Sequence, residues 1–226
     1  MASVLVAVIG NVQKMKNIFL LSVLLTFAGC KKNEARPDAV SKDPIAKKTS
    51  DAGIAKTNPE SKNIDLKKIN DEVLAALKNK NYKTFAEFIH PEKGVRFSMY
   101  AFTSIHEDKH FTKSDFIKYQ PTKTIFTWGA RDGSGDPYKA TVNQYLKNWV
   151  FVKDFTKGSY SVNEFQGGGN SLNNLKEIYP DKDFTENYIK GAGENNEMDW
   201  NTLRLVFEYF NGKYYLIAVV NDRWTI

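Results

Sequence analysis

Two of the three histidines have a spacing that could hold a metal ion. His106 and His110 lie four residues apart, so on a helix both imidazoles would face the same side. Thr112 and Asp115, however, resemble the capping box of a short helix, which leaves both histidines in the preceding loop. No third ligand has a recognisable spacing, so we interpret the pair as surface histidines, with a metal site as the weaker alternative.

Oxygen-bearing side chains recur at every second position in the loop that follows. Asp132, Ser134 and Asp136 have the spacing of the first ligands of an EF-hand calcium loop. Pro137 stands where that loop requires glycine, and Asn143 stands where it requires a bidentate glutamate. A turn followed by a helix, with Asp136 as the N-cap and Pro137 at the first helical position, explains the pattern better than calcium does.

General acid or base chemistry would depend on His90 or Asp222. His90 precedes Pro91, where a helix must end, and we expect it to cap that helix unless it points into a pocket. The sequence has no GxSxG nucleophile motif, and the glycines at 167–169 lack the lysine and the spacing of a phosphate-binding loop. No motif therefore identifies an enzyme, and we expect no cofactor.

Aromatic side chains are concentrated in the C-terminal three quarters of the chain. The sequence has 4 Trp, 11 Tyr and 15 Phe, and all but two phenylalanines lie within residues 64–226. Such a set could line an apolar or sugar-stacking pocket, although an aromatic core is the simpler explanation. Trp128 and Trp224, beside predicted turns, are the best candidates for exposed contacts, although both could equally close the ends of the fold. Arg204 and Tyr215, on the last two predicted strands, complete the candidate ligand-binding set.

Two N-terminal helices are expected to form a hairpin. Apolar residues recur at helical spacing from Leu66 to Leu77, with Asn63 or Asp65 as the cap, and again from Tyr82 to Ile89. Further helices are predicted after Thr112, from Pro137 to Val150 and near 172–178, and strands at 95–102, 123–128, 160–165 and 184–189. This mixture predicts an α+β domain.

The clearest structural signal is a hairpin near the end of the chain. Leu203–Phe210 and Lys213–Val220 are rich in β-formers, and Asn211-Gly212 between them favours a two-residue turn. Pairing Phe210 with Lys213 gives one wholly apolar face, on which Phe207 lies opposite Leu216, Leu205 opposite Ala218 and Leu203 opposite Val220. This register puts Arg204 and Asp222 on opposite faces, so they would share a pocket only if a bulge changed the phase.

The only cysteine follows a segment that is organised like a secretory signal. Lys14 and Lys16 precede an uncharged apolar stretch, 17–29, that ends in two small residues before Cys30. The stretch is shorter than the about 20 apolar residues that a membrane-spanning helix needs. Residues 1–14 fit no part of a compact signal, so Met15 is an alternative start of translation.

The residues after Cys30 fall into two segments of different composition, 31–63 and 64–226. Residues 31–63 contain no aromatic side chain and many charged and small ones, so they cannot bury enough apolar surface to fold. The formal net charge of +6 belongs mostly to this segment and the signal, because residues 64–226 hold 22 basic and 21 acidic side chains. A surface that binds nucleic acid needs a surplus of cations, so nucleic acid is not an expected partner. We expect a signal peptide at 1–29, a lipidated cysteine with a disordered tether at 30–63, and one globular domain at 64–226.

Two resemblances carry these expectations further. LTFAGC, residues 25–30, resembles the lipobox of bacterial lipoproteins, with Phe27 where leucine is usual. That resemblance implies that Cys30 is acylated, with palmitate among its fatty acids, and becomes the first residue of the mature protein. Membrane lipid is then a partner, and the protein is anchored in the bacterial cell envelope on the extracytoplasmic side. Nothing in the sequence decides between the inner and the outer membrane.

The second resemblance concerns the domain. FIHPEKGVRFS (88–98), TWGARDGSG (127–135) and the closing LRLVFEYFNGKYYLIAVVNDRWTI resemble an uncharacterised class of extracytoplasmic bacterial domains. The order of elements resembles the nuclear transport factor 2-like superfamily. That resemblance implies an N-terminal helical hairpin and a further helix packed on a curved, cone-like antiparallel sheet that ends in a long β-hairpin.

Members of this superfamily include enzymes and binding modules, so the fold alone does not give the function. We expect a non-catalytic module that binds a small molecule or an envelope protein. The first alternative is a small hydrolase or isomerase that uses the cone cavity, with His90 or Asp222 as the general base. The second alternative is an envelope inhibitor protein, which would expose a large apolar patch.

Overall fold

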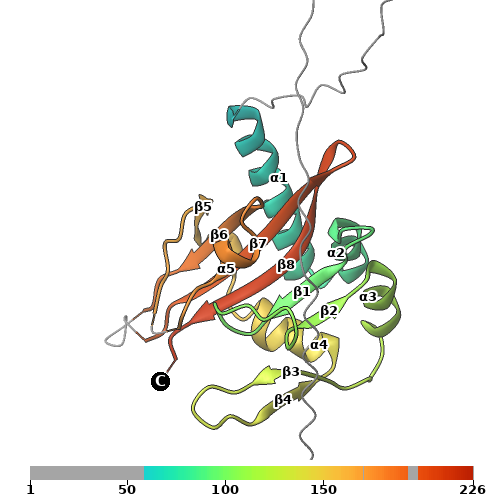
Figure 1. Cartoon of the computed structure of the whole chain (residues 1–226), viewed down its shortest axis with the longest axis vertical. Helices are drawn as coiled ribbons and strands as arrows, with labels where there is room; N and C mark the ends of the chain where they lie inside the picture. Colours follow the sequence, from blue (N-terminus) through green and yellow to red (C-terminus); the bar gives the residue numbers. More distant parts are fainter. Residues whose placement is uncertain (1–58, 170, 193–197, 226) are drawn as a thin grey trace, which may run out of the picture. The chain divides into compact units, whose positions relative to one another are not determined.

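The computed structural model describes residues 59–169, 171–192 and 198–225, all within one compact unit, 53–226 (Figure 1). The lipobox, Cys30 and most of the predicted tether lie outside the described residues. A six-stranded sheet, a separate two-stranded sheet and several helices make up the domain. The predicted mixed α+β class is therefore confirmed.

The large sheet is built from strands that are distant in the sequence. Its order is β2 (Lys109–Phe111), β1 (Val95–Ser98), β8 (Lys213–Arg223), β7 (Asn201–Phe210), β6 (Asp183–Ile189) and β5 (Ser159–Val162). All neighbours are antiparallel except β1 and β8, which run parallel. The long strands β7 and β8 lie at the centre, and their hairpin tip extends beyond the other strands beside α1 (Figure 1).

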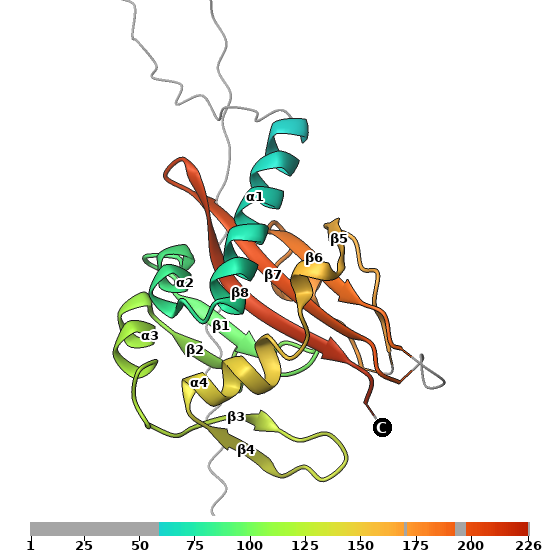
Figure 2. The same ribbon diagram turned by 180° about the vertical axis from the view of Figure 1, so that it is seen from behind.

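Most helices cover one face of this sheet (Figure 2). They are α1 (Pro59–Lys78), α2 (Tyr82–Phe88), α3 (Lys113–Tyr119) and α4 (Val142–Tyr145), which continues as the π-helical turn η1 (Leu146–Val150). The two-stranded sheet, β3 (Phe126–Ala130) and β4 (Pro137–Ala140), adds to the same apolar core, and a short 3₁₀ turn, η2, spans Phe155–Lys157. The other sheet face carries a smaller core, to which α5 (Leu175–Ile178) contributes Leu175.

The first helix begins earlier than the sequence suggested. Asn63 and Asp65, the predicted caps, lie inside α1, which starts at Pro59 with Glu60 in its first turn. Proline is well suited to the first helical turn, and an acidic side chain there interacts favourably with the helix dipole. A buried asparagine then holds α1 on the sheet: the Asn70 carboxamide donates to Asn187 Oδ1 over 3.0 Å and accepts from the Thr185 hydroxyl over 2.7 Å.

The helix predicted to start at Pro137 is wrong in its first turn. Residues 137–140 form strand β4, and the chain between Arg131 and Asp136 is the β3–β4 turn. Helix α4 starts after Thr141, whose hydroxyl accepts from the Gln144 backbone while the Gln144 side chain accepts from the Thr141 backbone. The reciprocal capping box outcompetes the Asp-Pro signal, because β4 needs residues 137–140 for pairing.

The terminal hairpin has the predicted turn and the predicted first pairs, but then its register changes. Phe210 pairs with Lys213 and Phe207 with Leu216, as expected. A bulge follows, so that Val206 pairs with Ala218 and Leu205 with Val219. Ile217 is the extra residue, and it points to the same face as Ala218. The predicted pairs of Leu205 with Ala218 and Leu203 with Val220 are therefore wrong, and every residue after the bulge lies on the face opposite to the one expected.

Candidate functional site

The bulge brings Arg204 and Asp222 together in the interior. Arg204 Nη2 donates to Asp222 Oδ2 over 2.9 Å, and Arg204 Nε donates to Glu186 Oε2 over 2.5 Å. Arg204 and Glu186 are 0% exposed and Asp222 is 3% exposed, so this cluster has no direct access to solvent. The unbroken register, which puts Arg204 and Asp222 on opposite faces, is wrong, and the alternative in which a bulge changes the phase is the one found.

A short loop closes over this ionic cluster. The backbone N–H groups of Gln166 and Gly167 donate to Glu186 Oε1 over 2.7 and 2.6 Å, and the Gly167 carbonyl accepts from Arg204 Nη2 over 3.1 Å. We call residues 165–169 the glycine strap. Glycine is required at position 167, because a Cβ there would lie 2.4 Å from a Thr202 methyl group. Gly169 is also closely packed, with a Cβ position 2.7 Å from Trp200, whereas a Cβ at Gly168 would meet nothing within 4 Å.

Some polar atoms in and beside this cluster make no hydrogen bond to another described residue. Arg204 Nη1, Asp222 Oδ1 and Thr202 Oγ1 are buried and have no hydrogen-bond partner within the described part of the chain. Burial raises the pKa of Asp222 above its ordinary value, and the neighbouring Arg204 guanidinium opposes that rise. Asp222 lines none of the surface clefts described below, so a substrate in those clefts would not reach its carboxylate.

His90, the second candidate base, has a structural environment. It is 0% exposed, and its Nδ1 accepts from the backbone N–H groups of Glu92 and Lys93 over 3.2 and 3.0 Å. Its ring packs against Phe210 and Tyr215, with centroids 4.7 and 5.7 Å away. Burial is the main cause that lowers the pKa of His90. The imidazole therefore organises the turn after α2, and it lines neither of the two clefts described below.

The three aromatic candidates differ in burial and in surroundings. Trp128 is 0% exposed, stacks on Tyr145 with centroids 3.7 Å apart and donates through Nε1 to the Ala140 carbonyl. Its predicted exposed contact is therefore wrong, since the β3–β4 sheet places it in the main core. Tyr215 is half-buried beneath the Lys213 ammonium, and Trp224 is half-buried in a surface cleft.

The weak metal candidates do not converge in the structure. His110 lies in β2, where its Nε2 contacts the Lys93 carbonyl over 2.6 Å, whereas His106 lies in the preceding turn. Asp132 and Asp136 belong to the β3–β4 turn, in which the Asp136 backbone N–H donates to the Ser134 hydroxyl. Among the described residues, no group of three or more histidine, cysteine, aspartate or glutamate side chains could hold a metal ion.

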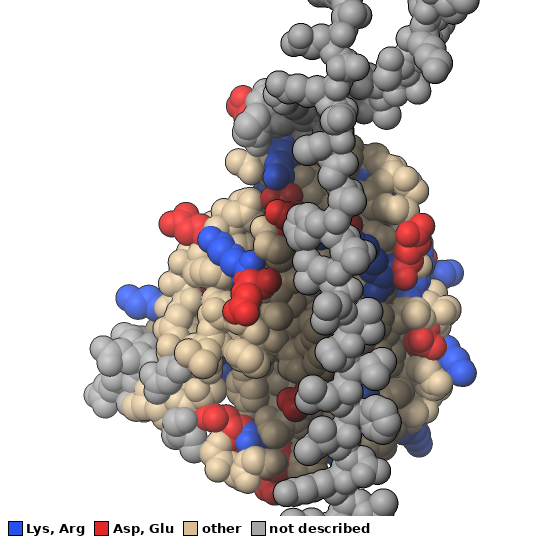
Figure 3. Space-filling model, in the orientation of Figure 1, with Lys and Arg blue, Asp and Glu red and all other residues tan. Residues whose placement is uncertain are grey.

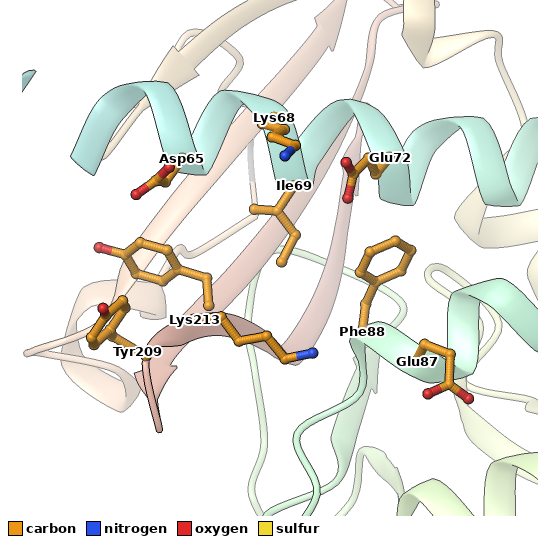
Figure 4. A pocket seen from close by; sticks show the side chains of 10 residues that line it. Asp65, Lys68, Ile69, Glu72, Glu87, Phe88, Tyr209 and Lys213 are labelled. Carbon is orange, nitrogen blue, oxygen red and sulfur yellow. The ribbon is translucent and has the colours of Figure 1, made fainter. Parts of the chain in front are cut away.

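One cleft lies between α1, the end of α2 and the tip of the β7–β8 hairpin (Figure 4). We call it the hairpin cleft; its volume is about 280 Å³. Its apolar surface comes from Ile69, Phe88 and Tyr214, with Tyr209 53% exposed at the rim. Figure 4 shows side chains of α1 pointing across the cleft toward Lys213 of the hairpin. The remaining lining residues are Asp65, Lys68, Glu72, Glu87 and Gly212.

The charges of the hairpin cleft belong to its rim. Glu87 forms an ion pair of 2.7 Å with Lys113, and that lysine holds the pKa of the Glu87 carboxyl below its usual value. The cleft contains no histidine or cysteine. Acidic and basic side chains also alternate over the visible surface of the domain, without a large region of one sign (Figure 3). Such a cleft can bind by apolar contact and tune specificity by charge.

A second cleft of about 370 Å³ includes Trp224, and we call it the Trp224 cleft. It joins the end of β8 to the β3–β4 turn and to η1, and its lining residues are Tyr100, Arg131, Asp132, Ser134, Trp149, Arg223, Trp224 and Thr225. Sequence reasoning found Trp224 but missed Arg131, Trp149 and Arg223. The turn motif around Asp132 was a usable signal, because it places Arg131 at the end of a strand.

Comparison of the sequence with protein-family models and with curated proteins gave no match. Within the part of the chain that the structure describes, none of the helices has the length and apolar character required to cross a bilayer.

Proposed function

We propose that this protein is an envelope lipoprotein whose domain is a non-catalytic binding module. The observation that supports a binding role is that neither candidate general base lies in a surface cleft described above. His90 and Asp222 are enclosed in the interior, whereas the hairpin cleft presents an apolar floor and an exposed tyrosine. General base catalysis needs a side chain within hydrogen-bond reach of the substrate, which favours binding over the hydrolase or isomerase alternative.

The anchor in this proposal is an acylated Cys30, and it rests on the lipobox-like LTFAGC segment. The 29 residues from Cys30 to the start of α1 could extend to about 100 Å. A domain on so long a connection can reach ligands or proteins well away from the membrane surface. The partner is an unidentified small molecule or envelope protein.

The proposed fold is the cone of the nuclear transport factor 2-like superfamily. Helices α1 and α2, joined by the turn at 79–81, support the helical hairpin, and α4 supports the further helix on the same sheet face. The long β7–β8 hairpin at the end of the chain supports the closing strands. The bulge at Ile217 supports curvature, because bulges bend the strand that carries them.

The test is recovery of a ligand from the full-length protein, purified from its native envelope in mild detergent. Native mass spectrometry is expected to detect a bound molecule or protein with the wild type and not with Tyr209→Ala. Tyr209 is 53% exposed, so its removal is not expected to disturb the fold. Ile125→Ala, at a site that is 56% exposed and outside the clefts, is the matched control.

Equal recovery by wild type and Tyr209→Ala would reject the hairpin cleft as the binding site. A turnover activity that Asp222→Asn abolishes, in a variant that keeps its wild-type circular dichroism spectrum, would replace the binding role with the enzyme alternative.

A further inference from the structure

Two arginines line the Trp224 cleft, and neither has a carboxylate partner among the described residues. Arg131 comes from the end of the β3–β4 hairpin, and Arg223 is the last residue of β8. The ion pairs found among the described residues include neither of them. Two guanidinium groups beside one cleft repel each other, so an anion between them would be bound favourably.

Arg223 is held in a position that suits a ligand. Its guanidinium carbon lies 3.6 Å from the ring centroid of Trp149, and Nη2 is buried without a hydrogen-bond acceptor among the described residues. Burial is the largest cause that lowers the pKa of Arg223, and the positive charge of Arg131 lowers it further. A buried donor without an acceptor costs free energy. Because Arg223 lines the cleft, a small shift of its guanidinium toward a ligand oxygen would give this donor an acceptor.

Arg131 is exposed, but its backbone is fixed. Its N–H donates to the Asp136 carbonyl over 2.8 Å, and its carbonyl accepts from Gly135 over 2.9 Å. The next residue ties the turn to the cleft wall, since the Asp132 backbone N–H donates to the Tyr100 hydroxyl over 2.8 Å. The Arg131 guanidinium lies 4.8 Å from the Tyr138 ring. The turn therefore presents this arginine at the cleft without needing to fold around a ligand.

The cleft also has apolar walls and a small net charge. Tyr100 and Trp149 contact each other edge to face at 5.3 Å, and Trp224 adds a half-buried indole. The lining holds two arginines and one aspartate, which gives a formal charge of +1. One negative charge matches this lining better than two. A ring or other carbon skeleton can pack against the aromatic walls.

We propose that the Trp224 cleft binds an organic monocarboxylate, with Arg131 and Arg223 contacting the carboxylate and the aromatic walls contacting its carbon skeleton. The planar guanidinium fork matches the two oxygens of a carboxylate. An aromatic acid and a sugar acid share this chemistry. The site goes beyond the proposed function, which concerns the separate hairpin cleft.

The experiment is a calorimetric titration of the full-length protein in detergent micelles with phenylacetate and with glucuronate. Phenylacetamide and glucose, which lack the carboxylate, are the uncharged comparisons. We expect at least one acid to bind about tenfold or more tightly than its uncharged counterpart. The acid that binds more tightly identifies the carbon skeleton as aromatic or sugar-like.

Arg131→Gln is expected to weaken binding of that acid about tenfold, because it removes a charged donor from an exposed position. Lys139→Gln removes one positive charge from the same hairpin at an exposed residue outside the cleft, and it is expected to bind like the wild type. Arg223→Lys keeps the charge without the planar fork and is expected to bind more weakly. Because Arg223 packs on Trp149, its thermal unfolding is measured in parallel.

Three results would overturn the site: equal affinity for acid and uncharged counterpart, wild-type affinity in Arg131→Gln, or displacement of the acid by an equal concentration of inorganic phosphate. Absence of binding by both acids at about 10 mM would also overturn it. These outcomes are independent of ligand recovery at Tyr209, so the two proposals can fail separately.

Discussion

The buried guanidinium of Arg204 is neutralised by close acidic partners. Arg204 contacts two carboxylates, Glu186 and Asp222, and the guanidinium also lies 4.9 Å from the Phe165 ring. Buried ion pairs often add little net stability, because desolvation offsets their attraction. They do, however, make alternative strand registers costly, since any slip would bury these charges without their partners. Their role here is to fix the register around the bulge.

Asp108 gives a pH dependence that can be measured at one residue. Its Oδ2 accepts from the Ser104 backbone N–H over 2.9 Å, yet burial raises the pKa of its carboxyl to about 6. Because this value lies above the unfolded value of 3.8, the folded state holds the proton more tightly. The stability that Asp108 contributes is therefore fully present below about pH 4 and is lost as the pH rises through about 6.

We expect the unfolding free energy of wild type relative to Asp108→Asn to fall by up to about 3 kcal/mol between pH 4 and pH 7. Urea denaturation at several pH values measures this difference. Asp181→Asn changes an exposed aspartate and should keep the wild-type pH dependence. A constant difference between wild type and Asp108→Asn across this range would contradict the assignment.

The sequence identifies candidate side chains, but it does not determine whether each of them is buried or exposed in the fold. Trp224, a candidate for an exposed contact, is half-buried and lines a surface cleft directly after the last strand. Trp128 was misplaced, since a tryptophan beside a turn can face either way and only the two-stranded sheet determines that it enters the core. Glu186, which completes the Arg204 cluster, has no local sequence signal. It becomes recognisable only when β6 pairs with β7.

The glycine strap is an element whose packing can be tested with neighbouring glycines. A Cβ at Gly167 would lie 2.4 Å from Thr202 Cγ2 and 2.9 Å from Tyr188 Cδ2, whereas a Cβ at Gly168 would meet nothing within 4 Å. We expect Gly167→Ala to lower the unfolding free energy by about 1–3 kcal/mol through overpacking. Gly168→Ala should stay within about 0.5 kcal/mol of the wild type. Urea denaturation compares them, and equal effects would mean that the strap is loosely packed.

The start of α4 distinguishes two capping residues. Thr141 makes both hydrogen bonds of a capping box with Gln144, whereas Asp136 lies in the β3–β4 turn. Thr141→Ala is therefore expected to lower the unfolding free energy by about 1 kcal/mol, because it removes the cap. Asp136→Ala, at an exposed residue, should change it by less than about 0.5 kcal/mol. The reverse order of the two effects in thermal or urea unfolding would restore Asp136 as the N-cap.

Element predictions succeeded where the signal is local. Asn211-Gly212 fixes the terminal hairpin because both residues adopt positive φ, 48° and 89°. Thr112 likewise caps α3 as its spacing to Asp115 suggested. The bulge could not be predicted, because residues 213–220 are rich in β-formers throughout and no glycine marks the break. The position of the unpaired residue, Ile217, depends on how side chains pack on both faces of the sheet, and that packing is a property of the whole fold.

At the scale of the molecule, most of the net charge and the proposed attachment site, Cys30, both belong to the residues that precede the domain. The domain is almost neutral, and most of the net charge of +6 lies in the residues that precede it. Both clefts lie on the described domain, so neither requires the anchor for its geometry. Attachment would instead determine where the module meets its ligands. A single substitution at Cys30 would remove that attachment.

Cys30→Ser is expected to move the protein from the membrane fraction to the soluble fraction of the envelope. Serine keeps the side-chain size but lacks the thiol to which the lipobox-like segment would direct a fatty acid, and the loss of acyl chains removes about 0.8 kcal/mol of membrane affinity per buried CH₂. Fractionation and intact mass of the purified protein measure location and lipid together. Thr26→Ser, a conservative change in the same segment, is the control that should retain both. A wild-type protein of unmodified mass, or a Cys30→Ser variant that still carries lipid, would show that Cys30 is not the anchor. In either case the binding experiments on the two clefts would still be valid, because the residues that line those clefts all lie within 65–225.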